Sequence, residues 1–217
     1  MATQDELKRQ AAFRAAEAGF AVQRIAARIE AGELRNIVGI PSSVGTESLA
    51  RELAIPLTDF EHRQQIDINI DGADEVDQDL NLIKGGGGAL LREKVVAQAS
   101  RRNIIIVDET KMSPRLGTNW PVPVEVIAFA RKVEEKFIVS LGASVTTRSL
   151  EDGSYFRTDQ KNLILDADFG QIADPAQLAA LLGGRAGIVE HGLFLGLASD
   201  VIVAGAGGVR HLKRKLS

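Results

Sequence analysis

Residues with acid, base and oxyanion-binding chemistry lie close together between positions 67 and 94, in the segment DINIDGADEVDQDLNLIKGGGGALLREK. The segment carries two aspartates on a turn, a lysine, four consecutive glycines and a glutamate. A carboxylate can move a proton, while an ammonium group and backbone amides can stabilise the oxyanion that forms when the proton leaves carbon. This combination predicts a site for proton transfer.

The first part of the segment predicts a strand followed by a turn. Polar and apolar side chains alternate over residues 67–70, which is typical of a strand, and Gly72 marks the turn that ends it. Asp71 and Asp74 therefore stand at the carboxyl end of a strand, where α/β sheets usually bind their ligands.

The second part predicts an anion-binding loop that leads into a helix. Residues 80–83 form a short extended segment, and Lys84 follows it. The glycines at 85–88 open a helix that begins near Ala89, which lets several backbone N–H groups approach an oxyanion or a phosphate. Glu93 lies in the first turns of this helix, so its side chain can reach back over the loop.

Each feature alone has an ordinary structural explanation. A DGAD turn usually caps a helix or a hairpin, a glycine run usually forms a flexible connector, and Glu93 with Lys94 would usually form a solvated helix face. A flexible linker is not expected between a buried strand and an apolar helix inside a compact domain. The order of the features along the chain therefore favours a functional site.

Composition excludes several classes of protein. The chain has 217 residues, a net charge of −3 and a pI near 5.7, so we expect no general attraction to nucleic acid or to anionic membranes. It has no cysteine, which excludes disulfides and thiolate chemistry and suits the cytoplasm. No apolar run is long enough to span a membrane. His62, His191 and His211 have no local metal-ligand partner, so we expect no metal site.

The alternation of strands and helices predicts an α/β fold. Residues 5–29 have a helical apolar stripe, residues 36–40 form a buried strand, and residues 46–53 form a helix. Residues 103–108 (NIIIVD) are typical of a parallel strand covered on both faces. We therefore expect a doubly wound, mostly parallel, Rossmann-like sheet.

From about Trp120 the pattern changes to shorter strands, which predicts a smaller α+β domain inserted into the first. The expected strands are residues 122–126, 143–148, 155–158 and 163–168, and the expected helices are residues 131–141 and 175–182. Residues 201–204 then form a strand that returns to the first sheet. The predicted domains are residues 1–118 plus 200–217, and residues 119–199.

Five segments together resemble type A ribose-5-phosphate isomerase: DGADEVDQDLNLIKGGGGALLREK, VDETKMSPRLG, WPVPVEVIAFA, ILDADFGQIADP and VEHGLFLGLASDVIVAG. The resemblance extends from about residue 32 to residue 212. It implies an aldose–ketose isomerase that interconverts ribose 5-phosphate and ribulose 5-phosphate through an enediolate, in the non-oxidative branch of the pentose phosphate pathway. It also implies a small sugar phosphate as ligand, no metal or nicotinamide cofactor, and a homodimer or tetramer.

The resemblance also implies roles for particular residues. Glu93 would be the base that moves the proton between C2 and C1, and Asp71 would open the sugar ring. Lys84 would stabilise the enediolate together with glycine amides. The implied substrate-binding residues are Lys8, Asp71, Gly72, Ala73, Asp74, Lys84, Gly85, Gly86, Gly87 and Lys111. His191 and Asp200 are expected to be structural.

One part of the family pattern is missing near residue 15. Family members carry a first strand there and a Gly-Thr-Gly-Ser-Thr loop that holds the substrate phosphate. Roughly fifteen residues are absent, judged from the length of a strand plus a tight loop. Lys8, at the phosphate end, is present. A natural loss and an altered or incomplete sequence both stay open, and we favour the second.

Two other functions stay open beside the isomerase. A catalytically impaired relative could keep the sugar-phosphate cleft without the phosphate loop, although pure binding would not require the base Glu93. A CoA-transferase-like enzyme could have similar sheets, but it would place a nucleophilic glutamate in a different motif, which we do not find.

Overall fold

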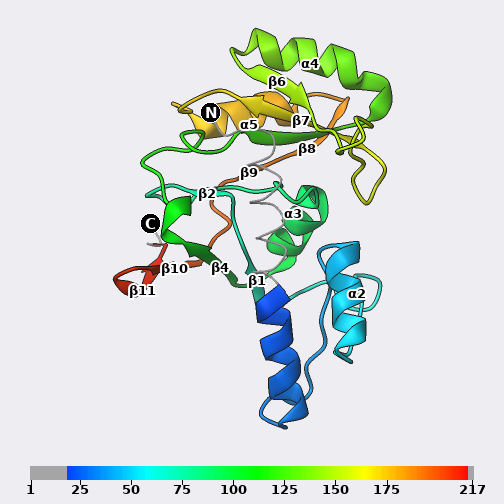
Figure 1. Cartoon of the computed structure of the whole chain (residues 1–217), viewed down its shortest axis with the longest axis vertical. Helices are drawn as coiled ribbons and strands as arrows, with labels where there is room; N and C mark the ends of the chain where they lie inside the picture. Colours follow the sequence, from blue (N-terminus) through cyan, green and yellow to red (C-terminus); the bar gives the residue numbers. More distant parts are fainter. Residues whose placement is uncertain (1–18, 215–217) are drawn as a thin grey trace.

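A mostly parallel sheet carries the strands that lead into the candidate residues (Figure 1). The computed structural model describes residues 19–214. The sheet has the order β1-β4-β10-β11, in which the first three strands are parallel and the last is antiparallel. Its strands are β1 (Asn69–Asp71), β4 (Asn103–Asp108), β10 (Asp200–Gly205) and β11 (Gly208–Lys213). The returning strand predicted at residues 201–204 is therefore confirmed as β10.

Strand β4 shows why this sheet forms. Its apolar run supplies side chains to a core that the parallel strands share, where Ile105 and Val107 pack with Val201 and Val203. Burying each such side chain contributes about 1.5 to 3 kcal/mol. The expectation that both faces are covered was wrong within the described residues, because Ile106, on the other face, is 40% exposed.

A small antiparallel sheet connects the candidate site to the rest of the fold. It has the order β2-β3-β9 and consists of β2 (Glu75–Val76), β3 (Leu82–Ile83) and β9 (Leu193–Phe194). Lys84, directly after β3, donates its backbone N–H to the carbonyl of Gly192 at 2.9 Å. The residue that carries the ammonium group is thus fixed by strands from two distant parts of the sequence.

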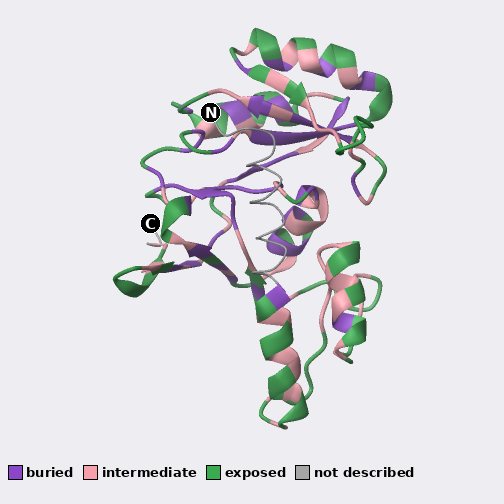
Figure 2. Cartoon of the chain, in the orientation of Figure 1, coloured by how far each residue is buried: buried purple, intermediate pink, exposed green. Residues whose placement is uncertain are grey.

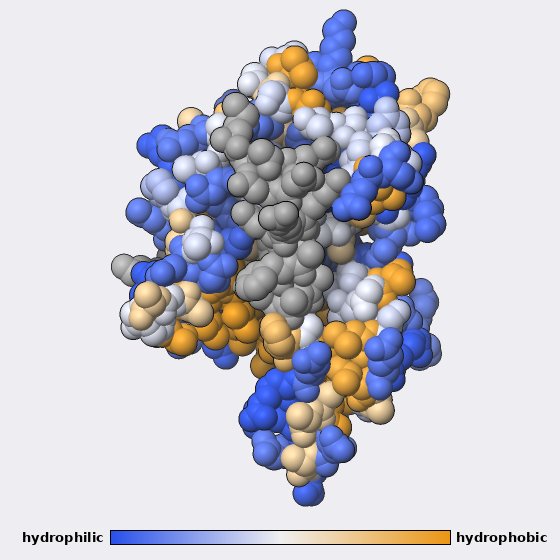
Figure 3. Space-filling view, in the orientation of Figure 1, coloured by the Kyte–Doolittle hydropathy of each residue, from blue (hydrophilic) through white to orange (hydrophobic). Residues whose placement is uncertain are grey.

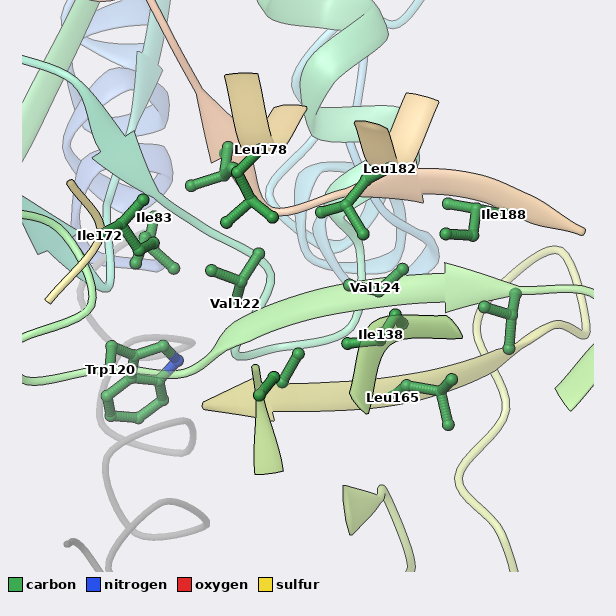
Figure 4. Close-up of a cluster of buried hydrophobic side chains, with 14 of the residues drawn as sticks. Ile83, Trp120, Val122, Val124, Ile138, Leu165, Ile172, Leu178, Leu182 and Ile188 are labelled. Atoms are coloured by element: carbon green, nitrogen blue, oxygen red, sulfur yellow. The ribbon is translucent and has the colours of Figure 1, made fainter. Parts of the chain in front are cut away.

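The remaining strands form a second antiparallel sheet with its own core (Figure 4). Its order is β6-β7-β5-β8, and Val122, Val124 and Leu165 of its strands pack against Leu178 and Leu182 of helix α5. The elements are β5 (Val122–Val126), α4 (Arg131–Ser140), β6 (Ser144–Thr147), β7 (Leu163–Asp168), α5 (Pro175–Gly183) and β8 (Ile188–His191). The first five match expected elements, whereas β8 was not predicted. The strand expected at residues 155–158 was wrong, because only an isolated bridge from Tyr155 to Ser149 forms there.

This second core also takes Ile83 and Leu116 from earlier parts of the chain. The proposed division into residues 1–118 plus 200–217 and residues 119–199 stays a prediction. The architecture of a parallel sheet with an added antiparallel α+β unit agrees with the predicted α/β, Rossmann-like class.

Helices complete the fold. Residues 19–30 are helical, and the rest of the helix expected at 5–29 lies outside the described residues. Helix α2 (Val44–Glu52) starts at Ser43, whose side chain accepts the N–H of Thr46. Helix α3 (Leu90–Ala99) packs against β5 and β8. Two short 3₁₀ turns occur at η1 (Glu109–Lys111) and η2 (Ala128–Ala130).

The strand expected at residues 36–40 was wrong. Only Gly39 pairs, in an isolated bridge with Leu57, and Ile37 and Val38 are 37% and 53% exposed. A strand is stable only when neighbouring strands satisfy its backbone and cover its side chains. Within the described residues β1 pairs only with β4, so residues 36–40 do not join the sheet.

Most of residues 19–60 are exposed or half-buried. Figure 2 shows this for the helix at residues 19–30 and for α2, whereas strands β5 and β7 are largely buried. Apolar surface is visible beside these helices in Figure 3. Ile68, just before β1, and Ile70, within it, are 52% and 42% exposed. No helix among residues 19–214 is both long and apolar enough to cross a membrane.

Candidate active site

Lys84 is the centre of the candidate site. Its side-chain nitrogen lies 3.0 Å from Asp71 Oδ2 and 3.2 Å from Glu93 Oε2, and it donates to the carbonyl of Gly72 at 2.7 Å. All three side chains are largely shielded, with exposures of 5% for Lys84, 13% for Asp71 and 17% for Glu93. The structure therefore places an ammonium group between two carboxylates in a protected environment, where charges interact more strongly than in water.

Burial by itself disfavours the charged form of Lys84. The negative charges of Asp71 and Glu93 outweigh this effect, so that the pKa of Lys84 is raised above its ordinary value. Lys84 thus remains a cation at neutral pH. A permanent positive charge can stabilise an oxyanion, whereas a neutral amine would act as a base.

Asp71 and Asp74 lie at the end of β1, as the sequence predicted. Asp71 Oδ1 accepts the N–H of Gly72 at 2.8 Å, which holds the carboxylate over the turn. Apart from its ion pair with Lys84, Asp71 Oδ2 accepts no hydrogen bond from the described residues, although it is buried. Asp74 Oδ2 accepts the N–H of Gly86 at 2.7 Å. The aspartate turn and the glycine loop are thus joined directly.

The glycine loop requires glycine at specific positions. Gly85 and Gly88 have φ angles of +103° and +88°, which other residues rarely adopt. A Cβ on Gly85 would lie 2.8 Å from Leu90 Cβ, and a Cβ on Gly88 would lie 2.4 Å from the ring of Phe156. The loop closes with a hydrogen bond from Gly88 N–H to the carbonyl of Gly85 at 3.0 Å. It is an ordered turn rather than a flexible connector.

Helix α3 begins directly after this loop and places Glu93 in its first turn. The next residue, Lys94, points into the protein and fixes the helix to β8. Its side-chain nitrogen donates to Glu190 Oε1 and to the carbonyl of His191, both at 2.6 Å. The ordinary explanation of a solvated helix face therefore does not apply to Lys94, which is 5% exposed.

These residues surround one cavity of about 330 Å³. It is large enough for a small sugar phosphate, and its polar groups converge as in ligand sites. The lining residues are Gly19, Val22, Ser42, Ser43, Gly45, Thr46, Leu49, Asp71, Gly72, Ala73, Asp74, Lys84, Gly85, Gly86, Gly87, Ala89 and Glu93. Nine of the implied site residues are therefore brought together.

The other two implied residues are Lys111 and Lys8. Lys111 lies in η1, 8% exposed, with its nitrogen 5.8 Å from the centre of the Trp120 ring, and it does not line the cavity. Lys8 lies outside the described residues.

A larger cavity of about 870 Å³ lies between residues 40–60 and α3, but Asp71, Lys84 and Glu93 do not line it. The smaller cavity is therefore the candidate active site, because the carboxylates and the lysine line it.

Within residues 19–214, no group of His, Cys, Asp and Glu side chains is arranged to hold a metal ion.

Comparison with known proteins decides the family. A family model described as ribose 5-phosphate isomerase A (phosphoriboisomerase A) matches residues 38–208. This chain belongs to that family. The match includes all the site residues implied by the sequence except Lys8, which precedes it.

Curated relatives agree over nearly the whole chain. The ribose-5-phosphate isomerase A of Desulfatibacillum aliphaticivorans is 55% identical, with 98% of this chain and 99% of the relative covered. That of Chloroflexus aurantiacus is 56% identical, with 90% of this chain and 82% of the relative covered.

The isomerase fold is also shared with solved structures. Ribose 5-phosphate isomerase from Plasmodium falciparum superposes with a TM-score of 0.88 and 38% identity over 91% of this chain and 87% of that one. A D-ribose-5-phosphate isomerase in complex with phospho-erythronic acid gives a TM-score of 0.88 and 36% identity over 90% and 86%.

The alignments also bear on the missing segment. The Desulfatibacillum alignment has 228 positions but covers 98% of 217 residues, which is about 213, so about 15 positions of the relative have no counterpart here. The Chloroflexus alignment has 195 positions and covers 90% of this chain, about 195 residues, so it needs no net gap. The number of unmatched positions in the Desulfatibacillum relative agrees with the absence predicted from the sequence.

Ser42 and Ser43 line the cavity, and their turn was expected to offer amides to the phosphate. Thr46 and Arg148 were not predicted, and Thr46 lines the cavity because α2 starts there. Arg148, directly after β6, contacts the glycine loop. No sequence pattern connects Arg148 with Gly85, 63 positions earlier. Ser43 caps α2 because the helix begins at Val44, two residues before the start predicted at residue 46.

Proposed function

We propose that this chain interconverts ribose 5-phosphate and ribulose 5-phosphate by proton transfer through an enediolate. The family supports the reaction, and the single observation that carries the mechanism is the position of the Lys84 ammonium group, 3.0 Å from Asp71 and 3.2 Å from Glu93. A base, an acid and an electrostatic catalyst are thus within reach of one small ligand.

In the proposed mechanism Glu93 removes the proton from C2 of the open-chain aldose. The electron pair of the C2–H bond forms the C1–C2 double bond, and the carbonyl electrons move to O1. Protonated Glu93 then returns the proton to C1, while the proton of the O2 hydroxyl is transferred to O1, which leaves the ketone at C2. Every atom of the substrate is retained, so the reaction needs no oxidant and no reductant.

Lys84 and the glycine loop would stabilise the charge that develops on the oxygens. The ammonium group is held by the Gly72 carbonyl, and its charge is maintained by the neighbouring carboxylates. Preorganised donors of this kind typically contribute a factor of about 10² to 10³ each. Asp71, whose Oδ2 is buried at the cavity, is the proposed group for opening the sugar ring.

The other implied substrate contacts stay proposals too. Asp74, Gly72 and Ala73 line the same cavity and are proposed to contact the sugar hydroxyls. Lys8 and Lys111 are proposed from the family resemblance alone, Lys8 for the phosphate and Lys111 for the substrate more generally.

The phosphate would have few partners among the described residues. The start of α2 faces the cavity, and a helix N-terminus attracts anions. However, the N–H of Val44 already donates to Asp159 Oδ2 at 3.0 Å. This carboxylate occupies part of the anion-binding capacity of the helix. We therefore propose weak binding of the phosphate in the absence of the missing loop.

A coupled assay of ribulose 5-phosphate formation tests the function, with the intact mass measured on the same sample. Formation of the ketose by protein of 23.3 kDa, abolished in Glu93→Gln, is the expected result. The alternative of a sugar-phosphate-binding relative predicts binding of ribose 5-phosphate without turnover. The presence of the complete carboxylate–lysine cluster favours the enzyme.

Assembly and location stay predictions. We propose a homodimer or tetramer in the cytoplasm that binds neither nucleic acid nor membranes. Light scattering of the purified protein tests the assembly, and cell fractionation tests the location.

A further inference from the structure

Arg148 of the antiparallel sheet reaches the glycine loop from outside the cavity. Its Nη1 donates to the carbonyl oxygens of Gly85 and Gly86, both at 2.9 Å. The other side of the guanidinium group pairs with Asp166, to which Nε donates at 2.9 Å. Arg148 is 16% and Asp166 17% exposed, so this pair is shielded from solvent and from its screening.

The hydrogen bonds from Arg148 to the loop carbonyls determine where the N–H groups of the loop point. A peptide group is planar and trans, so its carbonyl and its N–H point in opposite directions. With the carbonyl of Gly85 turned to Arg148, the N–H of Gly86 must point the other way, and it donates to Asp74 Oδ2 at 2.7 Å. By the same geometry, the carbonyl of Gly86 bound to Arg148 directs the N–H of Gly87 away from the guanidinium group.

The loop is therefore held from both sides. Asp74 lines the cavity and Arg148 does not. Phe156 adds a third contact on the outer side, because its ring lies 5.8 Å from the Arg148 guanidinium carbon and 2.4 Å from where a Cβ of Gly88 would be. Glycines lose more conformational freedom on ordering than any other residue, so a four-glycine loop needs such contacts to keep one conformation.

We propose that Arg148 is a positioning residue that orients the amide of Gly87 towards the oxygens of the reacting sugar phosphate and the amide of Gly86 towards Asp74. Its charge also polarises the two peptide groups and strengthens their N–H ends. The catalytic part of this inference rests on the proposed isomerase function, whereas the ordering of the loop does not.

Arg185 offers a matched control on the same antiparallel unit. It also pairs with a carboxylate, Glu134, through Nε at 2.9 Å, and its guanidinium carbon lies 4.4 Å from the ring of Phe137. These contacts do not involve the glycine loop. Arg148→Met and Arg185→Met thus remove the same kind of interaction, but only the first removes the bonds to the loop carbonyls.

The first measurement is amide hydrogen exchange by mass spectrometry, which needs no turnover. In Arg148→Met, exchange of the peptide covering residues 84–92 should accelerate by about 10-fold or more, while Arg185→Met should leave it unchanged. Arg148→Lys, which keeps the charge but not the fork of donors, should be intermediate and serves if the methionine variant does not fold.

The second measurement is kinetic. Arg148→Met should lower kcat by about 10-fold to 10²-fold with a much smaller change in KM, because the loop amides act on the charge of the transition state. In Arg148→Ala, added guanidinium ion should restore part of the lost turnover, which a purely structural role would not predict.

The outcomes separate this inference from the proposed function. Unchanged exchange of residues 84–92 in Arg148→Met would overturn the inference, as would equal acceleration throughout the protein or in Arg185→Met. If the loop responds as expected but the unaltered protein forms no ribulose 5-phosphate, the ordering role stands and the isomerase function fails. If the protein is active and kcat is unaffected in Arg148→Met, the orienting role in catalysis is wrong.

Discussion

Lys84 and Glu93 lie nine positions apart in the sequence and 3.2 Å apart at their charged atoms, on opposite sides of the glycine loop. The loop folds back because Gly85 and Gly88 adopt positive φ angles, which brings the start of α3 over the end of β3. The geometry of a turn thus creates the proposed pair of base and electrostatic catalyst.

Replacement of Glu93 by glutamine tests this pair. Glutamine keeps the shape but cannot accept a proton from carbon, so turnover should fall by about 10²-fold to 10⁴-fold with little change in KM. Exchange of the C2 proton of ribose 5-phosphate with deuterium from the solvent, followed by NMR, should slow to the same extent. Near-normal turnover of Glu93→Gln would exclude Glu93 as the base.

Alanine substitutions at the neighbouring positions Gly87 and Gly88 should differ strongly in their effect on the free energy of unfolding. In Gly88→Ala the new Cβ meets the Phe156 ring at 2.4 Å and φ is +88°, so the free energy of unfolding should fall by about 2 to 4 kcal/mol. A Cβ added to Gly87 would have no neighbouring atom within 4 Å, and Gly87→Ala should change the free energy by less than about 1 kcal/mol. Urea denaturation of both variants measures the difference. Equal effects would show that the loop adapts to a side chain at residue 88.

Much of this fold could be predicted from the sequence because its strands carry strong local patterns. NIIIVD at β4 is a continuous apolar run and the segment at β1 alternates polar and apolar side chains, and Gly72 marks the end of β1. The site residues between Asp71 and Glu93 were also predictable, since short loops keep residues that are close in sequence close in space.

Other parts depend on partners that no local pattern specifies. Residues 36–40 are as apolar as a buried strand, but a strand requires a neighbour, and only Gly39 pairs among the described residues. Likewise, Lys94 looks like a surface residue in the sequence, and only the fold brings Glu190 and His191 to its side-chain nitrogen. Long-range contacts of this kind decide burial, which propensities alone do not.

The environment of His191 predicts a pH dependence of stability. Burial, followed by the charge of Lys94, lowers the pKa of His191 to about 4. In the unfolded chain the pKa is about 6.5, so between these values the unfolded state binds more protons. Stability is therefore fully present above about pH 6.5 and is lost as the pH falls towards 4, with a slope approaching about 1.4 kcal/mol per pH unit.

Substitution of His191 by glutamine should reduce the change in the free energy of unfolding between about pH 6.5 and pH 4. Urea denaturation between pH 4 and 7 measures it, with His62→Gln as the control, because the His62 side chain is 76% exposed. A profile of His191→Gln as steep as that of the unaltered protein would assign the slope to other groups.

Chelation should not affect the reaction. The proposed electrophiles are the Lys84 ammonium group and the amides of Gly85, Gly86 and Gly87, and the hydrogen moves as a proton. Activity should therefore survive dialysis against EDTA. A loss that one added divalent ion restores would require a metal in the mechanism.

The last prediction concerns the segment of about 15 positions that the Desulfatibacillum relative has in excess of this chain. A loop that holds the phosphate would donate several charge-assisted hydrogen bonds, each worth about 1.5 to 3 kcal/mol. Loss of two such bonds raises KM by about 10²-fold or more, since 1.4 kcal/mol corresponds to a factor of ten. Because phosphate binding also positions the sugar, kcat should fall as well.

Insertion of the relative's segment near residue 15 should reverse both effects. KM for ribose 5-phosphate should decrease by about 10²-fold or more and kcat should increase, whereas a glycine–serine insertion of the same length should change neither. The described residues offer little compensation, because Asp159 already accepts the N–H of Val44 at the start of α2. An ordinary micromolar-to-millimolar KM and rapid turnover of the 23.3 kDa protein without any insertion would contradict this prediction and would mean that another part of the fold binds the phosphate.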